Sequence, residues 1–213
     1  MKRRNRGFTL MELMVVLSIA AVVVGIGAPS LTQFLKNNRL TNTANDLLSG
    51  MVKARSEAIK LQTDVSMCRS NNPTAATPTC TDGGTAGYIV FRDITGTKNC
   101  LRASTEPLVA VYTYDQSFTT TDPMRVAWNG NCLSFASTGF RQDIASRTTI
   151  SHVVVCDNRG KNKMAGSSLS AARGISVTRT GRARVTRITT GSGSTAGEGL
   201  GDDIATWTDT ACP

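Results

Sequence analysis

The chain has 213 residues, a formal net charge of +9 and only 5% aromatic residues. This length allows one or two domains, and so few aromatic residues are more typical of short strands and turns than of a helical bundle. Six cysteines without a CxxC pair, together with a single histidine, argue against a zinc site, which needs clustered ligands.

The first predicted element is a membrane-spanning helix over residues 8–28, FTLMELMVVLSIAAVVVGIGA. At about 1.5 Å per residue this apolar segment is long enough to cross a bilayer. No small-residue cleavage site follows it, so we expect the segment to stay in the mature protein. The basic residues before it would hold the N-terminus on the cytoplasmic side: Lys2, Arg3, Arg4 and Arg6.

One carboxylate, Glu12, interrupts the apolar segment, although an acidic side chain there costs about 2.5–3.5 kcal/mol. The residues KRRNRG followed by FTLMEL resemble the class III leader of type IV pilins and type II secretion pseudopilins. The resemblance implies cleavage after Gly7 by the prepilin peptidase and methylation of the new N-terminal residue, Phe8. It also implies that Glu12 pairs with the N-terminal ammonium of a neighbouring subunit during assembly. The alternative is that Glu12 only snorkels at the membrane surface.

A second, amphipathic helix is predicted over residues 29–62. Pro29, with two glycines shortly before it, indicates either a bend in one continuous helix or the end of the membrane helix. We expect the apolar stripe to pack against a sheet, with Lys53 and Arg55 on the solvated face. The stripe recurs mostly at three- and four-residue steps: Leu31, Phe34, Leu35, Ala44, Leu47, Leu48, Met51, Ala54, Ala58, Ile59 and Leu61.

The remaining residues, 63–213, predict a β-rich domain. Because the strands are closely spaced and no second amphipathic helix separates them, we expect antiparallel sheets rather than βαβ units. The glycine-rich stretch TGSGSTAGEGLGD lacks the ending of a phosphate-binding loop, so nucleotide binding is not expected. The predicted strands are rich in β-branched or aromatic residues: DVSMC, GYIVFRD, LVAVYTY, MRVAWNG, CLSFAS, TTISHVVVC, GISVTR and RARVTRI.

An even number of widely spaced cysteines behind a membrane-targeting segment predicts disulfides in an oxidising compartment. Cys68 and Cys80 flank a short loop and are expected to pair. The connectivity of the other four stays open, although a bridge that ties down the C-terminus, Cys156 to Cys212, is favoured. These four are Cys100, Cys132, Cys156 and Cys212.

The stretch ANDLLSGMVKARSEAIK, followed by VSMCRS and GYIVFRD, resembles the GspH/FimT-type domain, although Tyr88 stands where that pattern usually has tryptophan. The resemblance implies an α+β fold: a long N-terminal helix, with a membrane half and an amphipathic half, packed on the antiparallel β-sheets of a GspH/FimT-like pilin globular domain. The expected organisation is a leader (1–7), a transmembrane or filament-core helix (8–28), a joining helix (29–62) and a β-rich domain (63–213) with a basic region (158–190).

No set of residues predicts catalysis. His152 lies in a predicted strand, and no nucleophile motif such as GxSxG is present. Asp202 and Asp203 are adjacent, so they would point to opposite sides of an extended chain and could not act as paired acid and base. We therefore expect neither an enzyme nor a cofactor or metal site.

Positive charge is concentrated near the C-terminus. Localised basicity on an otherwise mildly acidic mature chain is what a polyanion-binding surface requires. The alternatives are contacts with acidic neighbours in a filament or with anionic lipid headgroups. Residues 158–197 contain no acidic residue and eight basic ones: Arg159, Lys161, Lys163, Arg173, Arg179, Arg182, Arg184 and Arg187.

Within this region GISVTRTGRARVTRI predicts a hairpin that turns near Gly181. With a three-residue loop, Arg182 and Arg184 would stand together on one face, where two like charges repel each other but both suit phosphate oxygens. GRAR, residues 181–184, resembles the GRxR motif of FimT-type minor pilins, which is associated with DNA capture during natural transformation. The other face would carry the apolar residues Ile175, Val177, Ala183 and Val185.

The sequence therefore predicts a minor type IV pilin that binds extracellular double-stranded DNA without sequence preference for natural transformation. The alternative is a structural minor pilin or type II secretion pseudopilin that acts in pilus initiation or tip assembly without binding DNA. Further expected partners are the major pilin, other minor pilins, the prepilin peptidase and the inner membrane. The domain would be periplasmic before assembly and part of a cell-surface pilus afterwards. The expected DNA-binding residues are Arg182 and Arg184, supported by Arg179, Arg187, Lys161 and Lys163.

Overall fold

The structure is a computed structural model that describes residues 8–94, 99–114, 124–160 and 169–189. The chain divides into two compact units, Met1–Arg39 and Leu40–Pro213. Helix α1 (Leu10–Leu61) contributes to both units, and the strands all belong to the second one.

Helix α1 begins where a threonine caps it. Thr9 Oγ1 accepts a hydrogen bond from the Glu12 N–H at 3.2 Å, which satisfies one of the free N–H groups of the first turn. The helix continues without a break through Pro29, so the alternative that residues 25–29 end the membrane helix is wrong. Its apolar N-terminal part is long and hydrophobic enough to cross a membrane, and the side chains there are exposed.

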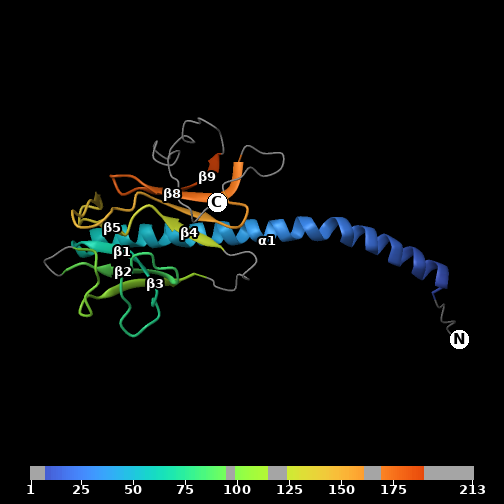
Figure 1. Ribbon diagram of the computed structural model, residues 1–213, viewed down its shortest axis with the longest axis horizontal. Helices are drawn as coiled ribbons and strands as arrows, with labels where there is room; N and C mark the ends of the chain where they lie inside the picture. The colour runs from blue at the N-terminus through green and yellow to red at the C-terminus, as the bar shows by residue number, and fades with distance from the viewer. Residues whose placement is uncertain (1–7, 95–98, 115–123, 161–168, 190–213) are drawn as a thin grey trace, which may run out of the picture. The chain divides into compact units, whose positions relative to one another are not determined.

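The second unit contains two antiparallel sheets (Figure 1). One has the order β3-β2-β1-β5-β6, with β1 (Val65–Ser70), β2 (Gly87–Arg92), β3 (Leu108–Thr113), β5 (Cys132–Phe135) and β6 (Arg141–Gln142). The other has the order β4-β7-β8-β9, with β4 (Arg125–Trp128), β7 (His152–Cys156), β8 (Leu169–Val177) and β9 (Ala183–Thr189).

All predicted strands are present, and each pair of neighbouring strands is antiparallel, as predicted. Two features were not predicted. The short strand β6 pairs with β5, and β8 begins at Leu169, well before the predicted GISVTR. The fold is therefore the expected α+β arrangement of a long helix and antiparallel sheets.

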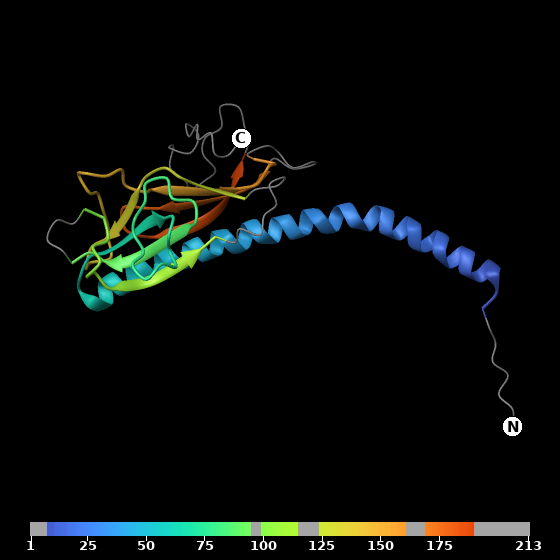
Figure 2. The ribbon, with the colours of Figure 1, turned by 60° about the horizontal axis from the view of Figure 1, so that its bottom comes forward.

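The main core lies between α1 and the two sheets, and both ribbon views show the last part of α1 running along the strands (Figures 1 and 2). Full burial of a side chain such as Leu47 or Met51 contributes roughly 1.5–3 kcal/mol. The predicted stripe is only partly confirmed, because its first and last members are exposed: Leu31, Phe34, Leu35, Ile59 and Leu61. The buried apolar side chains of the helix are Leu40, Ala44, Leu47, Met51, Ala54 and Ala58.

Tyr88, which replaces the usual tryptophan, packs directly across the helix. A Cβ atom at Gly50 would lie 2.4 Å from the Tyr88 hydroxyl oxygen, so the helix surface is open there for the ring. That hydroxyl donates a hydrogen bond to the Asp46 carbonyl at 2.9 Å. The tyrosine ring thus fills this part of the core, and the helix backbone provides the hydrogen-bond acceptor that its buried hydroxyl group needs.

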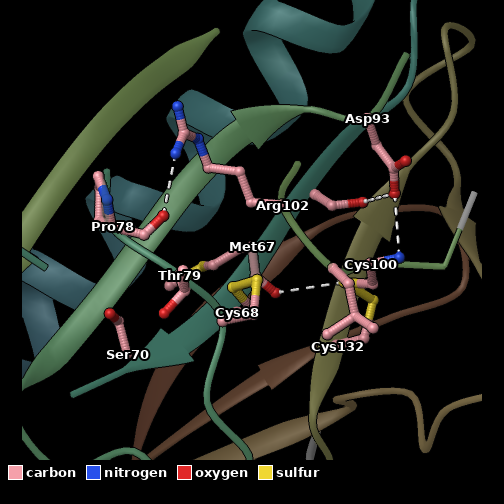
Figure 3. Close-up of a disulfide and its surroundings, with 12 residues drawn as sticks. Met67, Cys68, Ser70, Pro78, Thr79, Asp93, Cys100, Arg102 and Cys132 are labelled. Carbon is pink, nitrogen blue, oxygen red and sulfur yellow. Dashed lines mark hydrogen bonds between the residues drawn. A yellow bond between two sulfur atoms is a disulfide. The ribbon is translucent and has the colours of Figure 1, made fainter. Parts of the chain in front are cut away.

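Two disulfides link loops to neighbouring strands of the first sheet, on the face that points away from the main core (Figure 3). Cys68–Cys80 confirms the predicted pair, and Cys100–Cys132 is the second bridge. Cys68 and Cys132 are direct cross-strand partners on β1 and β5, so both loops are attached at one place on the sheet. Cys156 is also disulfide-bonded, whereas its predicted partner, Cys212, lies outside the described residues.

The two loops also bond to each other and to the sheet. Arg102 Nη1 donates to the Pro78 carbonyl at 3.0 Å and so connects them (Figure 3). The buried carboxylate of Asp93 accepts hydrogen bonds from Ser66 Oγ at 3.0 Å and from the Cys100 N–H at 3.2 Å. Burial raises the pKa of Asp93, and the two hydrogen bonds offset only part of this rise.

Candidate nucleic-acid interface

Strands β8 and β9 form the predicted hairpin. The Thr178 N–H donates to the Arg182 carbonyl at 3.0 Å and closes a loop at residues 179–181. On the core side, the β8 residues are buried and the β9 residues pack against them, so the predicted apolar face is confirmed. The cross-strand pairs of this face are Ile175 with Val185 and Val177 with Ala183.

The turn of this hairpin is fixed by contacts with two other elements. Gly181 has φ +77°, and a Cβ atom there would lie 2.1 Å from the Gly139 carbonyl oxygen. The same oxygen accepts a hydrogen bond from Arg55 Nε of α1 at 3.0 Å. Beside it, the Arg141 N–H donates to the Arg179 carbonyl at 3.0 Å. Only glycine fits at position 181 because the left-handed backbone and the close approach both exclude a side chain.

Arg55 does not belong to a solvated face, so that prediction is wrong, whereas Lys53 is exposed as expected. The Arg55 side chain is partly buried and bonds to Gly139, 84 positions away in the sequence. A helical pattern shows which side chains face a core, but it contains no signal for so distant a backbone partner. Sequence reasoning therefore missed both Arg55 and Gly139 as residues that position the turn.

The hairpin carries four exposed arginines, and Arg187 lies on the opposite face of β9 from Arg184. Alternation along β9 places Arg184 on the opposite face from Val185, as predicted, where it pairs with Ser176. Arg182 comes two residues earlier, directly after Gly181. Arg187 is the cross-strand partner of Arg173. Lys161 and Lys163 lie outside the described residues. The four exposed members, called the hairpin arginines from here on, are Arg179, Arg182, Arg184 and Arg187.

Two other basic residues of the region have structural roles. Arg173 is only 5% exposed, and its Nη1 donates to the Ala171 carbonyl at 2.6 Å. Burial, followed by the charges of Arg187 and Arg159, lowers the pKa of Arg173. Arg159 forms a salt bridge with Asp157. Among the described residues of this basic region, the exposed arginines therefore lie on the hairpin.

The structure gives His152 a buried place at the start of β7, where Ser151 Oγ lies 3.2 Å from its Nδ1. Among the described residues, no group of three or more His, Cys, Asp or Glu side chains could hold a metal ion. Asp202 and Asp203 lie outside the described residues.

In the N-terminal unit, Phe8 and Glu12 are both exposed, with Glu12 in the first turn of α1. The neighbouring apolar side chains, such as Leu10 and Leu13, are more than half exposed. A carboxylate among such side chains is available to a charged partner from outside this chain. Gly7, the predicted cleavage position, lies outside the described residues.

Comparison with known families identifies both parts of the chain. Residues 43–181 match the family described as type II transport protein GspH. The chain belongs to the GspH family. Residues 2–28 match the prokaryotic N-terminal methylation motif, which covers the basic leader and the apolar segment. A GspH protein with this motif is a pilin-like subunit, of a class that is anchored in the membrane, processed by the prepilin peptidase and assembled with other pilins.

Two solved structures are similar to this GspH protein, both crystal structures of the type IV minor pilin FimU from Pseudomonas aeruginosa PAO1. One is 18% identical with a TM-score of 0.47, and the match covers 78% of this chain and 97% of that one. The other is 16% identical with a TM-score of 0.41, and the match covers 75% and 98% of the two chains. No curated protein matches the chain. The GspH match ends at Gly181, immediately before Arg182.

Proposed function

We propose that this GspH-family protein is a minor type IV pilin that binds extracellular double-stranded DNA through the β8–β9 hairpin and serves DNA uptake in natural transformation. The observation that supports this is the group of exposed hairpin arginines on a turn fixed by Gly139 and Arg55. A fixed turn holds the backbone that carries the arginines in place before binding, so less backbone freedom is lost when their side chains meet phosphates.

The charge distribution supports a polyanion rather than a small ligand. Residues 158–197 have no acidic residue, and the exposed cations extend along one strand and its turn. Guanidinium groups bind phosphate oxygens in a two-pronged geometry. Contacts of this kind hold the backbone and do not read bases, so binding is expected to show little sequence preference.

The family match is equally compatible with a second candidate, a structural subunit that does not bind DNA: a structural minor pilin or a pseudopilin of a type II secretion system. In this case the hairpin arginines would contact acidic groups of a neighbouring subunit, and Glu12 would pair with the N-terminal ammonium of a neighbour. Both candidates require the leader to be removed and the chain to assemble with other pilins. They differ in whether the isolated protein binds DNA.

The deciding experiment measures DNA binding by the full-length protein in non-ionic detergent. A gel-shift series with a duplex of mixed sequence should show binding that weakens by about 0.9 log unit per log unit of salt for each phosphate contacted. The double variant Arg182→Gln, Arg184→Gln should lose most of the affinity. Its salt slope, the slope of log affinity against log salt concentration, should be smaller in magnitude by about 1.8. The variant should still fold and enter pili.

A matched control is available on the same sheet. Arg125 is also exposed and lies on β4, at the opposite edge of the strand order from β9. Arg125→Gln removes the same kind of charge and should leave both affinity and salt slope unchanged. If the wild-type protein fails to shift duplex DNA at low salt, or if the double variant behaves like Arg125→Gln, the structural candidate is preferred.

A further inference from the structure

The turn between β5 and β6 runs alongside the arginine-bearing turn. Gly139 contacts Gly181, and the Arg141 N–H donates to the Arg179 carbonyl at 3.0 Å. These two contacts align residues 139–141 antiparallel to residues 179–181. Phe140 therefore lies opposite the tip of the hairpin, with its backbone held on both sides.

The Phe140 side chain is unusual for this domain. It is 55% exposed, which makes it the most exposed large hydrophobic residue among those described in the second unit. Phe91 and Phe135 of the same unit are fully buried. The core does not require the Phe140 ring, because the turn is held by backbone bonds, including one of 2.9 Å from the Ala136 N–H to the Phe140 carbonyl.

An exposed aromatic side chain on a turn that runs alongside an arginine-bearing turn matches the chemistry of single-stranded nucleic acid binding. Proteins that bind single strands combine basic side chains along the backbone with aromatic rings on which bases stack. Bases inside a closed duplex are already stacked on each other and offer no free face. Stacking on Phe140 thus requires an unpaired base.

We propose that Phe140 is a stacking platform for an unpaired base, so that the hairpin site also takes single-stranded DNA or the frayed end of a duplex. This inference rests on the proposed function, because the hairpin arginines provide the phosphate contacts. Phe140 contributes only when a base is free, whereas the arginines act on both single and double strands. The ligand class is therefore wider than double-stranded DNA alone.

The test compares two DNA probes on the full-length protein: an oligothymidine strand, and a duplex whose two ends are closed by loops of non-nucleotide linker. Phe140→Leu keeps an apolar side chain of similar volume but removes the aromatic face. It should weaken binding of the oligothymidine by about tenfold and leave binding of the closed duplex unchanged. Phe140→Trp should retain binding of the oligothymidine, and the emission of the new indole should be quenched when the strand is added.

Phe34→Leu is the matched control, because Phe34 is 59% exposed but lies in the N-terminal unit; it should change neither affinity. If Phe140→Leu binds both probes as tightly as the wild-type protein, the inference about Phe140 is wrong. The proposed function then still stands, because the closed duplex is bound. If Phe140→Leu instead reduces pilus assembly without changing DNA binding, the ring serves a protein partner and the inference is again wrong. If the wild-type protein binds neither probe, the proposed function fails as well.

Discussion

Replacing Gly181 by alanine tests whether the close contact between the two turns holds the hairpin arginines in place. The new Cβ atom would lie 2.1 Å from the Gly139 carbonyl oxygen and 3.1 Å from Arg55 Nε. Normal contact requires the backbones to separate by at least about 1 Å. Such a shift would break the hydrogen bonds from Arg55 to Gly139 and from Arg141 to Arg179.

The expected cost has two parts. A side chain at φ +77° is disfavoured by about 1–2 kcal/mol. Losing a neutral hydrogen bond costs about 0.5–1.5 kcal/mol, and losing one to a charged group costs about 1.5–3 kcal/mol. We therefore expect Gly181→Ala to lower the free energy of unfolding by about 3–6.5 kcal/mol. For a chain of this size that corresponds to a fall in Tm of about 6–26 °C.

Gly83 provides the control, because it has nearly the same backbone angle, φ +78°, but nothing lies within 4 Å of an added Cβ atom. Gly83→Ala should therefore lower the free energy of unfolding by only about 1–2 kcal/mol. Thermal unfolding followed by circular dichroism in detergent measures both variants. Equal losses of stability for the two variants would refute the reasoning, because the contact with Gly139 would then contribute nothing.

Four further predictions concern processing, assembly and folding. Mass spectrometry of the mature protein should show cleavage after Gly7 and a methylated Phe8 as the N-terminus; an intact leader in assembled filaments would contradict this. Glu12→Ala should leave membrane insertion unchanged but reduce incorporation into pili in a pull-down of sheared filaments, and normal incorporation would indicate that Glu12 only snorkels. Cys80→Ser should lower the stability by about 2–5 kcal/mol, measured by urea unfolding with and without a reductant. Burial raises the pKa of Asp93, so the folded protein binds the proton of this carboxyl group more tightly than the unfolded chain does. The protonated carboxyl group therefore stabilises the fold below pH about 4, and this stabilisation is lost as the pH rises through the raised pKa. Asp93→Asn should reduce this loss, which urea midpoints at pH 4 and pH 7 would show; an unchanged difference between the two midpoints would contradict it.

Local patterns in the sequence were sufficient to predict the arginine hairpin and every described strand except β6. Alternation of apolar and polar residues on either side of Gly181 determines both which faces are buried and where the chain turns. The same kind of local argument identified the Cys68–Cys80 bridge, since a short loop joins the two residues. These features depend on residues close together in the chain.

The remaining features depend on contacts between distant residues. Strand β6 is too short to have an alternating pattern, and it pairs only because the preceding turn returns along β5. Leu31 and Phe34 continue the apolar spacing of α1 but lie before the unit that forms the core, and spacing alone does not show where a packing partner ends. Arg173 belongs to the basic segment, yet it is buried, and its guanidinium group donates to the Ala171 carbonyl, a contact that a count of charges does not reveal.

The two loop-attaching disulfides affect when the domain can finish folding. Ile89 and Phe91 on β2 cluster with Cys68 and Cys80, so the burial of these two side chains depends partly on the Cys68–Cys80 disulfide. In a reducing compartment the loops lose their covalent attachment, and this apolar surface is less well protected from water and from chaperones. The reduced chain therefore has two unattached loops beside an apolar strand, whereas the oxidised chain has both loops bound to the sheet. Formation of the two disulfides is thus the step that completes the packing of this side of the domain.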